Sequence, residues 1–105
     1  MRGEIIMKKI VLLCASGMST SMLVKTMEEA AAQMQYECQI SAYPTSEAIK
    51  QASDADLILL GPQVRFALNK IKAQCPGVLV EAIDMRMYGR MDGKGVVEFA
   101  KSKIG

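Results

Sequence analysis

The chain has 105 residues, half of them apolar, and a formal net charge of +2. This length forms a single domain with one core, and so small a charge, without a basic cluster interleaved with aromatic residues, argues against nucleic acid as a partner. The chain contains no histidine, which excludes a Cys-His pair, a Ser-His-Asp triad, histidine zinc ligands and a phosphohistidine carrier. We expect no metal and no cofactor.

The cysteines and the apolar runs indicate the cellular compartment of the protein. Cys14, Cys38 and Cys75 are an odd number without paired spacing, which suits a reducing compartment. The apolar run at residues 10–15 is too short to span a bilayer and lacks a secretory cleavage pattern. We expect a cytoplasmic protein. We interpret residues 1–105 as a single domain. Because Met7 is a candidate second start site, we interpret residues 1–7 as a disordered extension.

The first predicted element is a buried parallel strand at residues 10–13 that leads directly into Cys14. A small polar loop follows, and helical spacing begins after it at Met22, Leu23, Met27, Ala30, Ala31 and Met34. No carboxylate lies between Glu4 and Glu28, so the first amides of this helix stay available to an outside anion such as phosphate. The same field would lower the pKa of the Cys14 thiol. The alternative is a cysteine that only fills the core.

Strands and helices then alternate along the chain. Residues 38–43 alternate apolar and polar positions like an edge strand that Pro44 ends, and Thr45 is predicted to cap a short helix through Ala52. Residues 56–61 are predicted to be a central strand buried on both faces. The next helix has one apolar face and stops at Pro76-Gly77, which makes Cys75 a core thiol; this face comprises Val64, Ala67, Leu68, Ile71 and Cys75.

The last third of the chain completes an α/β pattern. Residues 78–83 are a fourth strand, residues 84–91 a loop, and Asp92 caps a final helix with Val96, Val97, Ala100 and Ile104 facing inward. Gly93-Lys94-Gly95 is interpreted as a glycine-rich helix entry and not as a nucleotide loop. The pattern predicts an open four-stranded parallel sheet, order 2-1-3-4, with helices on both faces. Cys14 would then face Gly61-Pro62-Gln63 at the topological switch point.

The Cys14 loop resembles the phosphate loop of low-molecular-weight tyrosine phosphatases, and the predicted fold is similar to theirs. In that family a cysteine, five residues and an arginine surround the phosphate, whereas Thr20 occupies the arginine position here. The absence of a bidentate cation, and of an Asp-Pro acid after the fourth strand, argues against efficient hydrolysis. The loop can still accept a phosphoryl group and pass it on.

Three motifs together resemble the enzyme IIB component of the bacterial sugar phosphotransferase system, lactose/cellobiose/diacetylchitobiose class. They are the loop from Cys14 to Ser21, Leu60-Gly61-Pro62-Gln63, and Tyr88-Gly89 with Asp92-Gly93. This resemblance covers nearly the whole chain in order and at matching spacing. It implies a protein-phosphocysteine–sugar phosphotransferase of the β-glucoside/disaccharide class, with Cys14 as the phosphocysteine.

The resemblance also implies partners and further site residues. The donor is a phosphohistidine on the IIA protein, and the acceptor is a disaccharide held by the membrane IIC transporter, which alone brings this monomeric protein to the membrane. Backbone amides and hydroxyls bind the phosphate; the residues are Ala15, Ser16, Gly17, Met18, Ser19, Thr20 and Ser21. Pro62, Gln63 and Tyr88 border the site, although Pro62-Gln63 could be only a turn and Tyr88 only a packing residue.

Two other functions stay open at this level. A cysteine-dependent phosphatase or arsenate reductase could use the same fold, although Cys38 and Cys75 are predicted too far away for a cysteine relay. A sensor or adaptor could bind phosphate at the loop without a covalent intermediate. The identity of the sugar does not follow from this chain, because selection belongs mainly to the transporter.

Overall fold

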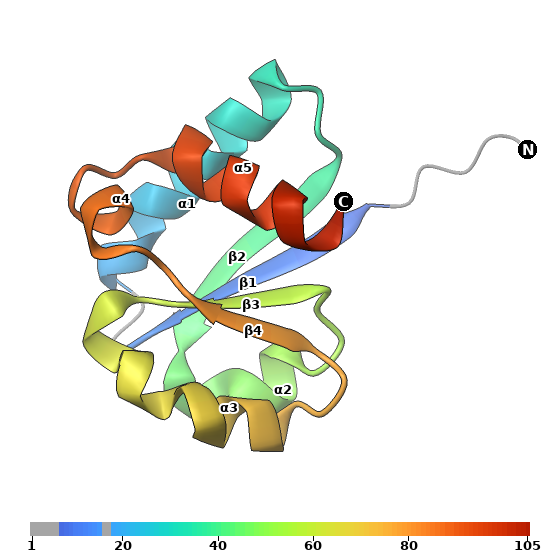
Figure 1. Ribbon diagram of the computed structural model, residues 1–105, viewed down its shortest axis with the longest axis vertical. Helices are drawn as coiled ribbons and strands as arrows, with labels where there is room; N and C mark the ends of the chain where they lie inside the picture. The colour runs from blue at the N-terminus through green and yellow to red at the C-terminus, as the bar shows by residue number, and fades with distance from the viewer. Residues whose placement is uncertain (1–6, 16–17) are drawn as a thin grey trace, which may run out of the picture.

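The computed structural model describes residues 7–15 and 18–105, with the backbone alone described for residues 18–20. Residues 1–6 of the expected extension, and Ser16 and Gly17 of the loop, lie outside the described residues. Every strand pair is parallel and the sheet order is β2-β1-β3-β4, as predicted (Figure 1). The strands are β1 (Lys8–Cys14), β2 (Cys38–Pro44), β3 (Leu57–Leu60) and β4 (Leu79–Ala82).

The two central strands explain why the core is divided into two layers. The side chains of residues 10–13 in β1 and of residues 57–60 in β3 are fully buried. Because successive side chains of a strand point to opposite faces, each strand contributes to both layers. Ile10, Leu12, Leu57 and Leu59 lie in one layer, and Val11, Leu13, Ile58 and Leu60 lie in the other.

Helices cover both faces of the sheet (Figure 1). One face is covered by α1 (Met18–Gln33), α4 (Met85–Gly89) and α5 (Gly93–Ile104). The other is covered by α2 (Ala48–Ala52) and α3 (Leu68–Gln74), each entered through a 3₁₀ turn, η1 (Thr45–Glu47) and η2 (Pro62–Ala67). The helix that follows β1 (α1) and the helix that follows β3 (α3) cover opposite faces of the sheet. The carboxyl ends of β1 and β3 therefore form the topological switch point.

Three local predictions need correction. Residues 84–91, predicted to be a loop, contain α4, because the Asp84 carboxylate accepts hydrogen bonds from the backbone N–H groups of Arg86 and Met87. Thr45 does not cap the helix through Ala52; it is the first residue of η1, which has no side-chain cap. The helix expected from Val64 is broken, since Val64 has non-helical backbone angles within η2.

The final helix matches its prediction. The Asp92 carboxylate accepts a hydrogen bond of 2.9 Å from the Gly95 backbone N–H, and the side chains of Val96, Val97 and Ala100 are buried. Across the described part of the chain, no helix combines the length and apolar character needed to cross a membrane.

Candidate functional site

Cys14 is the last residue of β1 and lies between the ends of two neighbouring strands. In the parallel register it pairs with Pro44 of β2. On its other side, the Gly61 N–H donates a hydrogen bond of 2.9 Å to the Leu13 carbonyl. A Cβ built on Gly61 would lie 3.6 Å from the Cys14 Cβ, so this glycine brings the chain after β3 close to the cysteine. The predicted meeting of Cys14 with Gly61 is confirmed.

The helix after the loop begins four residues after Cys14 in the chain. The backbone of α1 is helical from Met18, and its first turn contains no acidic residue. Its amino-terminal N–H groups therefore lie at the same end of the sheet as Cys14 and are not offset by a carboxylate of that turn. Ala15 and Ser21 are exposed, whereas Ser16 and Gly17 lie outside the described residues. Phosphate binding by residues 15–21 stays a prediction.

Cys14 is only 2% exposed, although it ends the strand next to the loop. Its side chain is thus almost fully covered in this structure. Exposure alone would favour Cys38, which is half-buried and begins β2 at the opposite end of the sheet. The position of Cys14, and not its accessibility, distinguishes it from the other cysteines.

The environments of the other two cysteines favour the neutral thiol. Burial raises the pKa of the Cys75 thiol, and its Sγ lies 3.6 Å from the Ala48 carbonyl oxygen, to which it donates. Burial is also the main cause that raises the pKa of Cys38, with smaller contributions from the negative charges of Glu37 and Glu28. Cys75 is a core thiol, as predicted.

The residues predicted to border the site come together in one hollow. It has a volume of 320 Å³ and is lined by Pro62, Gln63, Met85, Tyr88 and Gly89; we call it the Gln63–Tyr88 hollow. A Cβ built on Gly61 would lie 3.5 Å from the Gln63 Oε1 as well as 3.6 Å from the Cys14 Cβ. Thus the Gln63 amide and Cys14 approach a common point.

Tyr88 and Met85 contribute differently to the Gln63–Tyr88 hollow. Tyr88 is buried and belongs to the core layer beneath α1 and α5, so the packing interpretation describes most of its side chain. Met85 is exposed and was not predicted, because its segment was interpreted as a loop. Asp84 is the signal that could have revealed it, since an aspartate before an apolar turn is a typical helix cap.

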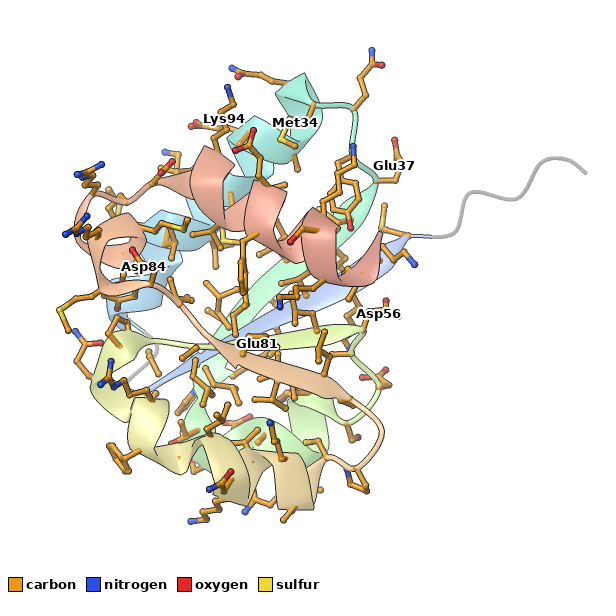
Figure 2. All side chains as sticks on the ribbon, in the orientation of Figure 1. Met34, Glu37, Asp56, Glu81, Asp84 and Lys94 are labelled. Atoms are coloured by element: carbon orange, nitrogen blue, oxygen red, sulfur yellow. The ribbon has the colours of Figure 1, made fainter. Side chains whose placement is uncertain are left out.

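Three arginines belong to the segments that follow β3 and β4, whose carboxyl ends lie at the same end of the sheet as Cys14. Arg65 in η2 and Arg86 in α4 are exposed, and Arg90 follows α4 directly. Asp84, labelled beside α4 in Figure 2, is engaged as a helix cap, whereas the labelled Glu37 and Asp56 lie at the opposite end of the sheet. Among the described residues, no group of three His, Cys, Asp or Glu side chains could hold a metal ion.

The chain matches one family model and is similar to several known proteins. The family model described as the lactose/cellobiose-specific IIB subunit of the PTS system matches residues 9–99. Over 98 residues the chain is 42% identical to the oligo-beta-mannoside-specific EIIB component of the PTS system from Bacillus subtilis (strain 168), covering 91% of this chain and 95% of the relative. It is 38% identical over 102 residues to the cellobiose-specific EIIB component from Lactococcus lactis subsp. lactis (strain IL1403), covering 90% of this chain and 94% of the relative.

Solved structures agree with these sequence matches. A solution structure of a cellobiose-specific IIB component from Borrelia burgdorferi is 30% identical, with a TM-score of 0.79 over 96% of this chain and 94% of that one. The lactose-specific IIB domain from Streptococcus pneumoniae has a TM-score of 0.83 at 20% identity, over 92% of this chain and 97% of that one. At 20% identity, the likeness to the Streptococcus pneumoniae domain shows a shared fold alone.

Proposed function

The chain belongs to the lactose/cellobiose-specific IIB subunits of the sugar phosphotransferase system, and we propose that it carries the phosphoryl group on Cys14. The observation that supports this most strongly is the position of Cys14 at the switch point, beside the unneutralised amino terminus of α1. A nucleophile and an anion site there coincide. Backbone amides of residues 15–20, helped by the hydroxyls of Ser16, Ser19, Thr20 and Ser21, bind the phosphate.

The proposed reaction has two transfers. The Cys14 thiolate attacks the phosphorus of a phosphohistidine on the IIA protein; an S–P bond forms, the N–P bond breaks and imidazole leaves. A hydroxyl of a sugar bound to the IIC transporter then attacks the same phosphorus; an O–P bond forms and the S–P bond breaks. The thiolate needs no base to attack and no acid to leave, and a base of the transporter accepts the hydroxyl proton.

Gln63 and Tyr88 border the bound phosphoryl group in this proposal. Gln63 is the better placed of the two, because its amide oxygen and Cys14 approach a common point beside Gly61. Its amide N–H₂ can donate to a phosphate oxygen after rotation of the amide. Tyr88 contributes mainly by holding the wall of the Gln63–Tyr88 hollow.

Hydrolysis and arsenate reduction are less well supported. Thr20 occupies the position at which the phosphatase loop has its arginine, so a bidentate cation for the transition state is absent from the loop. A cysteine relay would need a second thiol near Cys14. Cys38 lies at the opposite end of the sheet, and Cys75 is buried beyond α3.

The relatives carry names for oligo-beta-mannoside, galactose and cellobiose. These names support a sugar acceptor, which we propose to be a disaccharide of the β-glucoside class chosen by the transporter. The protein would act as a cytoplasmic monomer that reaches the membrane only through IIC.

Phosphorus NMR after incubation with phosphorylated IIA tests the proposed function. We expect a phosphothiol signal with the wild-type protein and with Cys38→Ser, and no such signal with Cys14→Ser. A signal retained by Cys14→Ser would contradict the assignment. Hydrolysis of an aryl phosphate, with inorganic phosphate released at many turnovers, would instead favour the phosphatase.

A further inference from the structure

Gly93, the first residue of α5, is buried where α5 packs against α1, and it does not line the Gln63–Tyr88 hollow. A Cβ built on Gly93 would lie 2.3 Å from the carbonyl carbon of Thr26 and 2.5 Å from the Thr26 oxygen, both in the backbone of α1. At this point the two helices therefore touch without room for one methyl group. Any side chain here would have to push α5 and α1 apart.

The helix α1 has no room to yield toward the sheet. Its side chains Leu23 and Met27 are fully buried in the core layer that also contains Ile10 and Leu12 of β1. Because such a core is close-packed, a push from α5 can move α1 only across the sheet or along its own axis. The turns of α1 are joined by backbone hydrogen bonds, so the helix moves as one body. Its amino terminus, beside Cys14, would therefore move with residues 26 and 27.

A hydrogen-bonded turn joins the first turn of α5 to α4. The Asp92 N–H donates a hydrogen bond of 2.9 Å to the Met87 carbonyl, and the Met91 N–H donates one of 3.1 Å to the Tyr88 carbonyl. The Gly93 N–H donates a hydrogen bond of 2.9 Å to the Met91 carbonyl. A displacement at Gly93 is therefore transmitted to α4, which carries Tyr88, a wall of the Gln63–Tyr88 hollow.

Gly93 thus connects the two sides of the proposed phosphoryl site. On one side, the amino terminus of α1 presents its backbone N–H groups. On the other side, α4 and Gln63 form the Gln63–Tyr88 hollow. Phosphoryl transfer needs the reacting atoms and the stabilising N–H groups in fixed mutual positions, and a misplacement of about 1 Å can slow a reaction by about a hundredfold. The contact at Gly93 fixes the separation of α1 from the α4–α5 unit.

We propose that Gly93 is a positioning residue for phosphoryl transfer, an inference that rests on the proposed function. By holding α5 against α1 without a side chain, it sets the distance between the amino terminus of α1 and the Gln63–Tyr88 hollow. Gly93 is buried and lies outside that hollow, so it acts through α1 and α4 and not by contact with a partner. This role predicts an effect on the rate of the chemical step and none on the binding of the donor.

Two substitutions of one methyl group in α5 test this role. Gly93→Ala adds a methyl group against the α1 backbone, whereas Ala100→Gly removes one from the buried face of the same helix and pushes nothing aside. Both destabilise the fold, so all three full-length proteins are assayed at one concentration of trimethylamine N-oxide at which circular dichroism shows each of them fully folded. The rate of Cys14 phosphorylation is measured over a range of concentrations of phosphorylated IIA.

We expect the maximal rate constant of Gly93→Ala to fall by about tenfold or more, while the donor concentration that gives half the maximal rate stays at the wild-type value. Ala100→Gly should match the wild-type protein in both quantities. A wild-type maximal rate in Gly93→Ala would overturn the inference, as would a higher half-maximal donor concentration at an unchanged maximal rate, or an equal fall in Ala100→Gly. Failure of the wild-type protein to accept phosphate on Cys14 would instead reject the proposed function.

Discussion

Gly93 shows how one small residue sets the distance between two helices. A Cβ at this position would lie 2.3 Å from the Thr26 carbonyl carbon and 2.5 Å from the Met27 nitrogen, both backbone atoms of α1. Because backbone cannot move aside as a flexible side chain can, only glycine permits this close approach of α5 to α1. Since α1 also presents its amino terminus beside Cys14, the packing at Gly93 supports the site indirectly.

We predict that Gly93→Ala lowers the free energy of unfolding by about 3 kcal/mol, the upper range for overpacking a buried position. Gly89→Ala is the matched control, because a Cβ there meets no atom within 4 Å. Its effect should stay within about 0.5 kcal/mol. Urea denaturation monitored by circular dichroism measures both variants. Equal stability of the two would contradict the packing argument.

At the residue scale, the sequence predicts which residues are suited to chemistry better than it predicts which residues are in contact. Cys14 could be singled out because a thiol, a polar loop and a helix without early carboxylates follow one another in the chain. Gln63 and Tyr88 could be named only as a border, since their meeting in one hollow depends on α4. Gly93 was interpreted as a helix entry, because the neighbour that requires a glycine lies on α1, far away in sequence.

At the scale of elements, α4 is held by its cap. It has five residues, too few for a stable isolated helix. The Asp84 carboxylate accepts hydrogen bonds of 3.0 Å and 3.2 Å from the N–H groups of Arg86 and Met87. Met85 and Tyr88, two walls of the Gln63–Tyr88 hollow, therefore depend on Asp84 for their positions.

We predict that Asp84→Ala destabilises α4 by about 1 kcal/mol, the usual loss for an N-cap, whereas Asp84→Asn is close to wild type because asparagine also caps. Amide hydrogen exchange measures this locally. The Tyr88 amide, which donates to the Asp84 carbonyl, should exchange faster in Asp84→Ala, and amides in the middle of α5 should not change. Unchanged exchange in α4 would contradict the role of the cap.

The elements that the sequence predicts well are those with a long hydrophobic pattern. Continuous apolar runs identified β1 and β3, and alternation identified β2 as an edge strand. The short elements were missed or misplaced. One turn of helix, such as α4 or η1, contains too few residues for a periodic signal, and its start is decided by hydrogen bonds that only the folded chain shows.

For the whole molecule, three acidic groups, the buried Cys75 and the half-buried Cys38 and Tyr36, make the free energy of unfolding depend on pH in the alkaline range. Burial is the main cause that raises the pKa of Cys38, Cys75 and Tyr36. Negative charge at Cys38 and Asp56 raises the pKa of Tyr36 further. Each raised pKa means that the folded state holds its proton longer than the unfolded chain does. Stability is therefore complete below the unfolded pKa values and is lost as the pH rises above them.

We predict that the free energy of unfolding falls as the pH rises above about 8.5, the ordinary pKa of a cysteine thiol. Urea denaturation at a series of pH values, with reductant present, measures this dependence. The double variant Cys38→Ala/Tyr36→Phe removes two of the three groups and should show a shallower decline. A stability that stays constant or rises toward pH 10 would contradict the pKa directions.

The whole architecture was the most predictable property of this chain. Right-handed crossovers and one edge-like strand were enough to predict the order β2-β1-β3-β4, which the structure confirms. The exposure of Phe66 was not predictable in the same way. Phe66 and Ile49 occupy separate segments, and their exposure on one hollow follows only from the packing of η2 and α3 against η1 and α2.

The most direct test of the central claim is to locate the phosphoryl group by peptide mapping after transfer from phosphorylated IIA. Lysines separate the three cysteines in the sequence, so trypsin places Cys14, Cys38 and Cys75 in different peptides. We predict that the phosphate is found on the peptide of residues 10–25, which contains Cys14, and that Cys14→Ser leaves every peptide unmodified. Phosphate on a peptide with Cys38 or Cys75, or on the Cys14→Ser protein, would contradict the account.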